Sequence, residues 1–469
     1  MSSKTEQILG WIMLCFAALF MVYVLIAFNG TGDAGDSIQH YLFARWAPLH
    51  PELYFHHWAK PLFTFISSPF AQFGIIGIKV FNATVSLLSV YLTYKTALHL
   101  KLKNSYLVIP IMVFTPVFIT MSFSGLTEPL FALGVISSVY FVVRKELVTA
   151  CFIISFLPFV RSEGMFFIGI AFGYLAFIGQ WKKIPILMIG HVFYSFLGYF
   201  WKSDLLWVFS ENPYSGVNQV YGTGKLFHFA GQHIYLLGIP ILIFFAIGLF
   251  YSSFFFRYLK MDKGALFFIV GGYWTFFIAH SIFWYFGIFG SMGLTRVFLG
   301  VLPLMAIISL YGWNLIADQL LIKLNPSVKV LITGVVILLI AGFPFVKNPA
   351  AVNWEKEMNL NEEQVKAEQI SSEILPLHSK RMVFAHPYLA VVLDIDPWNE
   401  KMYDALTNEY LEHGMQQGDL IIWDEWFCPV QYNVPIDELL TNPNLTENEL
   451  GDSTQFYRTF SVTKKVHIE

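Results

Sequence analysis

The sequence predicts a polytopic α-helical membrane protein with about eleven transmembrane helices, followed by a small α/β domain. Two observations predict the membrane part. Of the 469 residues, 56% are hydrophobic and only 13% are charged, whereas soluble domains carry about 25% charged residues. Apolar stretches of roughly 20 residues, the length that crosses a bilayer, recur along the first three quarters of the chain.

These apolar stretches define eleven candidate spans, of which the three near residues 129–180 are short. The first stretch is too long for a cleavable signal and lacks a small-residue cleavage site, so we expect it to remain as a transmembrane helix. The predicted spans are 8–28, 75–98, 106–121, 129–143, 147–160, 165–180, 184–200, 235–256, 264–286, 297–318 and 328–346.

Clusters of cationic residues precede the first span and follow every second span after it. Short cationic loops face the cytoplasm under the positive-inside rule. We therefore expect a cytoplasmic N-terminus and an extracytoplasmic C-terminal domain. The cations are Lys4, Lys101, Lys103, Arg144, Lys145, Lys182, Lys183, Arg257, Lys260, Lys263, Lys323 and Lys329.

The connections on the opposite face are longer and carry most of the acids found outside the C-terminal region. The largest are the outer loops 29–74 and 201–234, so a functional site is expected on the outer face. The predicted domains are a transmembrane domain over residues 1–348 and a small soluble extracytoplasmic α/β domain over residues 349–469.

Within the soluble domain, Asn361-Glu362-Glu363-Gln364 resembles a capping box that begins a helix. Residues 381–385 and 419–423 read as short buried strands, and Phe460, Val462, Val466 and Ile468 share one face of a closing strand. Asp394-Ile395-Asp396 spells the Asp-x-Asp of metal-dependent sugar transferases, but so short a match is interpreted as a loop after a strand.

The first outer loop holds the leading catalytic candidate, Asp36. A carboxylate at the membrane boundary loses hydration, which favours its protonated form and suits a general base. Asp36 or Ser37 is equally suited to capping a helix through Tyr41 and Trp46. Asp33, in a Gly-rich segment, is interpreted as a turn residue.

Other polar residues of the same loop are candidate substrate ligands. His40, His56, His57 and Lys60 supply donors or positive charge for a phosphate or for sugar hydroxyls. The alternative is an interfacial belt anchored by aromatic residues such as Trp58. Two adjacent histidines do not make a zinc site by themselves.

Two further short polar segments, around Glu128 and around Arg161, carry acids and a cation near the outer ends of spans. Glu128 precedes Pro129 and is suited either to helix capping or to substrate contact. Arg161 and Glu163 lie between two short apolar runs, and buried charges in membranes are usually functional. They are also suited to neutralising each other, or Arg161 to pairing with Glu128.

Arg296 stands at the start of a span as an unpaired outward-facing cation, suited to a substrate anion or to a lipid headgroup.

His191 and His280 lie inside spans, where single polar residues more often form interhelical hydrogen bonds than bind ligands. Three cysteines give no disulfide framework and no metal spacing. No cofactor is predicted, and the sequence gives no indication of a bound divalent metal.

Taken together, these polar sequence segments resemble those of the membrane-embedded glycosyltransferases of the C-type (GT-C) fold, especially bacterial polyprenol-linked mannosyltransferase-like proteins. The resemblance covers roughly the first 350 residues. The motifs that carry it are Gly35-Asp36-Ser37, Trp58-Ala59-Lys60-Pro61-Leu62, Thr127-Glu128-Pro129-Leu130-Phe131, Arg161-Ser162-Glu163-Gly164 and Thr295-Arg296 with Leu302-Pro303.

The resemblance implies an enzyme of the bacterial inner or plasma membrane that moves a sugar, with a mannose-like hexose favoured, from a polyprenyl-phosphate donor to an acceptor hydroxyl. The acceptor is a glycan, a lipid or a protein, and nucleic acid is not expected as a partner. Transfer inverts the anomeric centre, with Asp36 as the base. The family usually has two adjacent acids in this loop, whereas Ser37 follows Asp36 here, so Asp33 remains a second candidate.

The short cytoplasmic loops independently favour a lipid-linked donor, because they cannot fold a domain that binds a nucleotide sugar. The alternative functions are a flippase for lipid-linked sugars or another multispan transporter, which would place charges near the bilayer midplane and show related halves. A receptor-like protein would instead keep Asp36, Arg161 and Arg296 apart, each with its own local partner.

Overall fold

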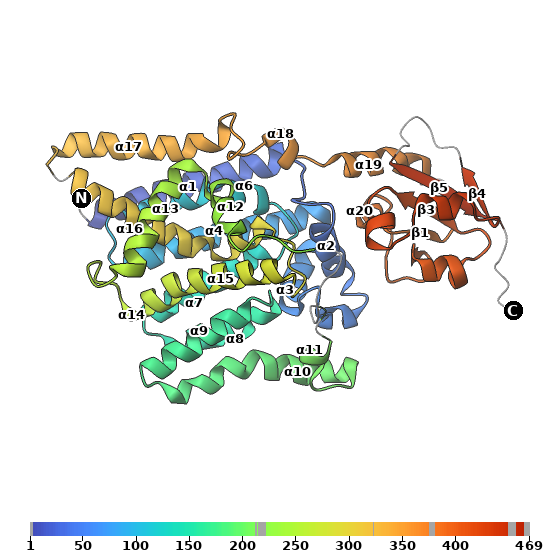
Figure 1. The fold of residues 1–469 in the computed structure, drawn as a ribbon, viewed down its shortest axis with the longest axis horizontal. Coiled ribbons are helices and arrows are strands. Elements are labelled where there is room, and N and C mark those ends of the chain that lie inside the picture. Colours follow the sequence, from blue (N-terminus) through green and yellow to red (C-terminus); the bar gives the residue numbers. More distant parts are fainter. Residues whose placement is uncertain are drawn as a thin grey trace.

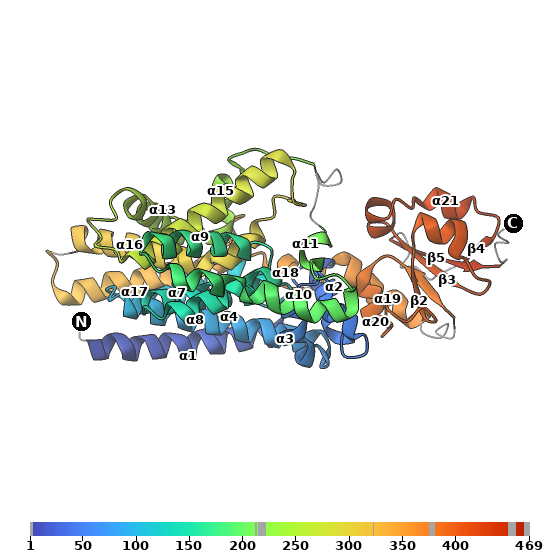
Figure 2. The same cartoon turned by 90° about the horizontal axis from the view of Figure 1, so that it is seen from below.

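The computed structural model describes residues 3–211, 213, 222–321, 323–374, 380–448 and 456–463. A bundle of roughly parallel and antiparallel helices forms one part, and a small domain built on a β-sheet lies at one end of it (Figures 1 and 2). The N-terminal helix begins at the opposite end of the bundle. Val466, Ile468 and part of the predicted outer loop 201–234 lie outside the described residues.

Six helices of the described chain are long and apolar enough to cross a membrane, and the chain is an integral membrane protein. Four shorter apolar helices accompany them. The long helices are α1 (Ser3–Ala27), α4 (Gly74–His99), η4 with α10 (Trp181–Met188, Ile189–Lys202), α14 with η5 and α15 (Lys263–Ala265, Leu266–Val270, Gly271–Phe286), η6 with α16 (Thr295–Val301, Leu302–Leu320) and α17 (Pro326–Gly342). The shorter ones are α7 (Glu128–Val143), α8 (Leu147–Phe156), α9 (Gly164–Phe177) and α13 (Ile239–Phe254).

The predicted span 106–121 is not one helix. It is divided into α5 (Val108–Val113) and α6 (Pro116–Met121), which meet at Thr115 in extended conformation. Proline has no backbone N–H and disfavours the helical conformation of the preceding residue, so Pro116 interrupts the helix and begins the next.

Helix α16 lies at the centre of the bundle and α17 at its edge. In the most apolar stretch of η6 with α16, 83% is buried inside the protein, whereas in that of α17 only 11% is buried. Close approach of α16 to α13 depends on two glycines. A Cβ atom at Gly312 would collide with the carbonyl of Phe244, and one at Gly248 with the carbonyl of Ile308. Small residues at such crossings allow the backbones of membrane helices to pack directly.

The opening segment 29–74 contains helices α2 (Asp36–Trp46) and α3 (Pro61–Ala71) joined through the 3₁₀ helix η1 (Pro51–Phe55). Helix α2 confirms the helix that the sequence offered from Asp36 through Trp46, whereas α3 lies where we expected a loop. Pro61 occupies the first turn of α3, where its missing N–H costs nothing. The two helices pack against each other and bury Phe63 and Tyr41. Secondary structure in this segment gives its polar side chains fixed positions.

The C-terminal domain contains a five-stranded mixed sheet with the strand order β2-β1-β3-β5-β4. Strand β1 is parallel to β2 and β3, whereas β5 is antiparallel to β3 and β4, with Ile421 opposite Val383 and Phe460. The strands are β1 (Met382–Phe384), β2 (Tyr403–Ala405), β3 (Leu420–Asp424), β4 (Leu445–Asn448) and β5 (Tyr457–Val462). Accompanying helices are α18 (Trp354–Glu357), α19 (Glu362–Ile374), α20 (Pro387–Val392) and α21 (Ile436–Leu440).

The capping box predicted at the start of α19 is confirmed. The backbone N–H of Gln364 donates to the side chain of Asn361 at 2.9 Å, and that of Asn361 donates to the side chain of Gln364 at 3.2 Å. The amide of Gln364 also donates to Thr31 at 2.9 Å, so the same residue joins α19 to the segment before α2.

The Asp-Ile-Asp stretch is a loop, as expected, but it follows helix α20 rather than a strand. Asp394 pairs with Arg45 of α2 at 2.9 Å, and Asp396 contacts His50 at 2.8 Å. Trp398 packs against Phe43 of α2 with ring centroids 4.8 Å apart. This acidic segment therefore holds the C-terminal domain against α2.

Candidate active site

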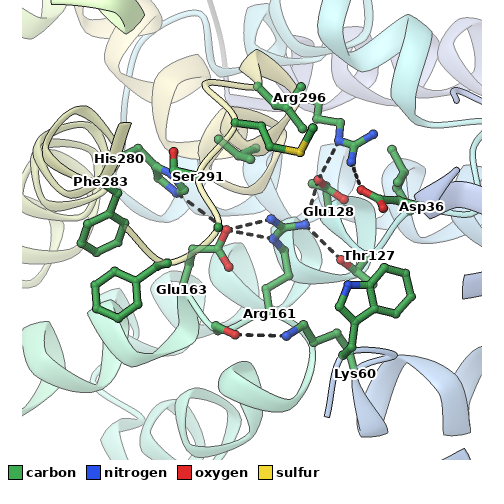
Figure 3. A pocket seen from close by; sticks show the side chains of 18 of the residues that line it. Asp36, Lys60, Thr127, Glu128, Arg161, Glu163, His280, Phe283, Ser291 and Arg296 are labelled. Atoms are coloured by element: carbon green, nitrogen blue, oxygen red, sulfur yellow. Dashed lines mark hydrogen bonds and ion pairs between the residues drawn. The ribbon is translucent and has the colours of Figure 1, made fainter. Parts of the chain in front are cut away.

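A cavity of about 710 Å³ lies beside the first turn of α2. Its wall combines ionic side chains from segments far apart in sequence with an aromatic surface (Figure 3). The polar and ionic lining comprises Asp36, His40, Lys60, Thr127, Glu128, Arg161, Ser162, Glu163, His280, Ser291 and Arg296. The aromatic lining comprises Trp58, Phe166, Phe229, Phe283 and Phe289.

Asp33 shapes the turn that leads into α2. One of its carboxylate oxygens accepts the N–H groups of Gly35 at 3.0 Å and Ser37 at 2.9 Å, as in an Asx turn. Burial raises the pKa of Asp33, and the nearby Arg296 only partly opposes this. Asp33 is not among the residues that line the cavity.

Asp36 is the first residue of α2, and Gly35 rather than Asp36 or Ser37 occupies the N-cap position. The side chain of Asp36 is 45% exposed and lines the cavity, whereas that of Asp33 is 24% exposed. Ser37 is buried and accepts the N–H of Gly125. A Cβ atom at Gly125 would collide with the carbonyl of Ser37, so a glycine is required there.

Arg296 is ion-paired, which corrects the expectation that it stands alone. Its two terminal nitrogens contact Asp33 and Asp36, and its Nε lies 3.7 Å from Glu128. These acids come from the opening segment and from the start of α7, more than 160 residues earlier in the chain. The sequence contains no local signal for such pairing.

Glu128 and Arg161 continue the charged row across the cavity wall. Glu128 is buried and accepts from Arg161 at 2.8 Å. Arg161 also donates to Thr127 at 3.1 Å and to Glu163 at 2.7 Å. We call the row Asp33, Asp36, Arg296, Glu128, Arg161 and Glu163 the ion-pair network. Arg161 therefore contacts both acids that the sequence offered as its partners.

Glu163 remains ionised at the far end of this network. Burial raises its pKa, but Arg161 and His280 lower it by more, to about 2. A carboxylate accepts about four hydrogen bonds, and the two from Arg161 both reach the same oxygen, Oε1.

Lys60 lines the same cavity. Its ammonium donates to Ser162 at 3.0 Å, and its backbone adopts a left-handed conformation with φ of 68° just before Pro61. Strained backbone of this kind in a non-glycine residue is concentrated at functional sites. Burial lowers the pKa of Lys60 to about 7, against the opposing effect of Glu163.

His40 lies one helical turn after Asp36 and stacks on Trp58, with ring centroids 4.6 Å apart and planes 12° from parallel. Burial lowers the pKa of His40 to about 3, although Asp36 opposes this change. His40 is therefore a neutral imidazole at physiological pH. The stacked pair forms one wall of the cavity.

His56 and His57, predicted as substrate ligands, do not line the cavity. His56 packs on Phe43 with ring centroids 4.6 Å apart and accepts the N–H of Ala59, and His57 contacts the carbonyl of Val208 at 3.1 Å. His56 therefore packs against α2 and His57 against α11 (Trp207–Ser210).

His280 of α15 is a cavity residue that sequence reasoning missed. It was expected to form an interhelical hydrogen bond, but its Nε2 has no hydrogen-bond partner among the described residues. Its Nε2 lies 3.7 Å from Oε1 of Glu163, and both residues are labelled in Figure 3. A lone histidine in an apolar stretch carries no signal that distinguishes these two settings.

Within the described residues, no group of three or more histidine, cysteine or acidic side chains is arranged to hold a metal ion. Asp33 and Asp36 are ion-paired with the guanidinium of Arg296. The site offers a half-exposed carboxylate, buried cations and aromatic surface within one cavity, an arrangement suited to a substrate that is both anionic and polyhydroxylated.

No family model matches the chain, and no curated protein matches its sequence. Among solved structures, it is similar to ArnT from Cupriavidus metallidurans bound to undecaprenyl phosphate, with a TM-score of 0.63, 12% identity, and coverage of 97% of this chain and 98% of that chain. The apo state of ArnT gives a TM-score of 0.64 at 12% identity, covering 98% and 99%. Arabinofuranosyltransferase AftD from Mycobacteria gives 0.49 at 10% identity, covering all of this chain and 40% of that one. The chain has the GT-C fold that ArnT also has, including the small C-terminal sheet domain.

Proposed function

We propose that this protein is a membrane glycosyltransferase that transfers a sugar from a polyprenyl-phosphate donor to an acceptor hydroxyl, with inversion at the anomeric carbon. The observation that carries the proposal is the convergence of Asp36, Lys60, Arg161 and Arg296 on one cavity. The shared fold supports the reaction class, and the undecaprenyl phosphate bound to ArnT supports a polyprenyl-phosphate ligand. A mannose-like hexose is the sugar that the sequence motifs favour.

Asp36 is the general base in this proposal. Of the two aspartates that contact Arg296, Asp36 has the more exposed side chain and is the one that lines the cavity. It removes the proton of the acceptor hydroxyl as that oxygen attacks the anomeric carbon. Positive charge develops on the sugar ring in such transition states, and the carboxylate also stabilises this charge.

Cations at the cavity wall stabilise the negative charge that develops on the departing lipid phosphate. Removing one such preorganised donor typically costs about 3 kcal/mol of transition-state stabilisation. The candidates for this role are Arg296, Lys60 and Arg161, which all line the cavity. A phosphate that draws Arg296 away from Asp36 would release the base at the moment the donor binds.

We place the site on the extracytoplasmic face of a bacterial inner or plasma membrane, with the N-terminus cytoplasmic and the C-terminal domain outside. The short cationic loops support this orientation through the positive-inside rule. In the structure the N-terminal end of α1 and the C-terminal domain lie at opposite ends of the bundle (Figure 1). The acceptor enters beside α2, where the C-terminal domain is docked.

The ionic groups of the cavity form one network rather than a series through the bundle, which favours an enzyme over a transporter. Asp36, Arg161 and Arg296 also share this network rather than lying apart with separate partners, so the receptor-like alternative is disfavoured.

The test is transfer by purified protein from a panel of polyprenyl-phosphate hexoses and pentoses, with Asp36→Asn as the variant and Asp33→Asn as the matched control. A positioned general base contributes about 10²- to 10⁴-fold, so Asp36→Asn should lower kcat by that factor and Asp33→Asn by much less. Retained transfer by Asp36→Asn removes it as the base. No transfer by the unchanged protein from any donor overturns the proposed function.

A further inference from the structure

The end of the cavity farthest from Asp36 along the ion-pair network contains a second polar site, formed by His280 and Glu163. His280 is only 7% exposed and is surrounded by aromatic rings, with Phe276 at 4.4 Å and Phe283 at 6.2 Å between ring centroids. Its Nε2 nevertheless has no hydrogen-bond partner among the described residues. Buried polar atoms are nearly always hydrogen-bonded, so an unpaired one on a cavity wall suggests a ligand.

The distance between the two residues suits a bridging hydroxyl. Nε2 of His280 lies 3.7 Å from Oε1 of Glu163, which exceeds the 2.7–3.2 Å of an ordinary N–H···O hydrogen bond. A hydroxyl is both a donor and an acceptor. One placed between these atoms, after a small shift of either side chain, can donate to the carboxylate while it accepts the N–H of the imidazole.

The surroundings fit a sugar ring. Phe283 and Phe289 stand edge to face with centroids 4.7 Å apart and line the cavity with His280. Figure 3 shows His280 and Ser291 beside Glu163 on this side of the cavity. A sugar ring presents hydroxyls at its edge and C–H groups on its faces, which requires a few convergent polar groups in an aromatic wall.

We propose that His280 and Glu163 together bind one hydroxyl of the transferred sugar and so determine which sugars the enzyme accepts. This inference rests on the proposed function. Arg296, Glu128 and Arg161 separate Glu163 from Asp36 in the network. The recognised hydroxyl is therefore one remote from the anomeric carbon, where the base acts.

The experiment compares each transferred donor with its monodeoxy analogues in the unchanged protein and in two variants. His280→Phe keeps an aromatic ring but removes both nitrogens, and His280→Gln restores an N–H donor near the position of Nε2. His233→Phe is the matched control. His233 is also buried among aromatic rings, but its nitrogens contact Phe229 and Tyr273, and it does not line the cavity.

For the unchanged protein, one monodeoxy donor should lose about 10- to 100-fold in kcat/KM, the range expected when a hydrogen bond to a charged group is lost. His280→Phe should lose part of this factor with the parent donor and should discriminate less against that analogue than the unchanged protein does, because only the hydrogen bond to Glu163 is left. His280→Gln should recover part of the loss, and His233→Phe should keep the full discrimination. Thermal unfolding in detergent checks that each variant is folded.

Two results overturn the inference while the proposed function stands: His280→Phe discriminates as the unchanged protein does, or the unchanged protein accepts every monodeoxy donor equally well. Transfer from no parent donor at all overturns both the proposed function and this sugar site.

Discussion

Donor use should depend on pH through Lys60. Burial lowers the pKa of its ammonium to about 7, whereas the unperturbed value is about 10.4. Below pH 7 Lys60 is mostly charged and able to hold the donor phosphate, and above pH 7 it loses that charge. A lipid phosphodiester is a monoanion throughout this range, so the change must come from the protein.

The expected magnitude follows from the protonated fraction. With a pKa of about 7, Lys60 is about 90% protonated at pH 6 and about 10% at pH 8. Because kcat/KM reports the free enzyme, it should fall about ninefold between these values. In the bound state the phosphate stabilises the ammonium, so kcat should fall only at higher pH. His40, with a pKa of about 3, does not titrate in this range.

The assay measures kcat/KM for the donor from pH 6 to pH 9 in the unchanged protein, in Lys60→Arg and in Lys60→Met. Arginine keeps its charge at all these pH values, so Lys60→Arg should abolish the fall between pH 6 and pH 8. Lys60→Met should be low and flat. An unchanged alkaline fall in Lys60→Arg would refute the assignment to Lys60.

Three further predictions concern the surroundings of the site. Arg296→Met should destabilise the protein by about 1–2 kcal/mol, because the partly buried Asp33 loses its ion-pair partner and solvent reduces the cost relative to a fully buried pair. Adding Asp33→Asn should recover part of this loss in thermal unfolding, and an additive double variant would contradict the pairing. Asp396→Ala should speed proteolytic release of the C-terminal domain, since the contact with His50 is lost, and unchanged cleavage would exclude this contact as a tether. His57→Ala should change kcat/KM less than twofold, because the ring lies outside the cavity, and a tenfold fall would restore it as a ligand.

Local chemistry explains why much of the fold can be predicted from the sequence. Span length and apolar content are properties of contiguous residues, so the membrane class and most of the helices follow from them. The same holds for the Asn361–Gln364 capping box, whose two partners are three residues apart. Prediction fails at Pro116, where one proline outweighs an apolar run.

The opening segment shows where local patterns are insufficient. The sequence offered a helix from Asp36 only as an alternative to a catalytic role and offered none at α3. Both helices form because each buries an apolar side against the other. Whether Asp33 or Asp36 reaches the cavity depends on this packing. The residues are three apart in sequence, yet one bonds its own turn and the other faces the cavity.

The sequence by itself determined a multispan membrane protein with acids, cations and a soluble domain placed on one predicted face. The tertiary structure alone decided which of those groups meet. Arg296 pairs with acids more than 160 residues away, and His280 lies near Glu163. His56 and His57 lie outside the cavity. The physical reason is that charge pairing in a membrane protein is set by how helices cross, and side-chain spacing along one helix says nothing of its neighbours.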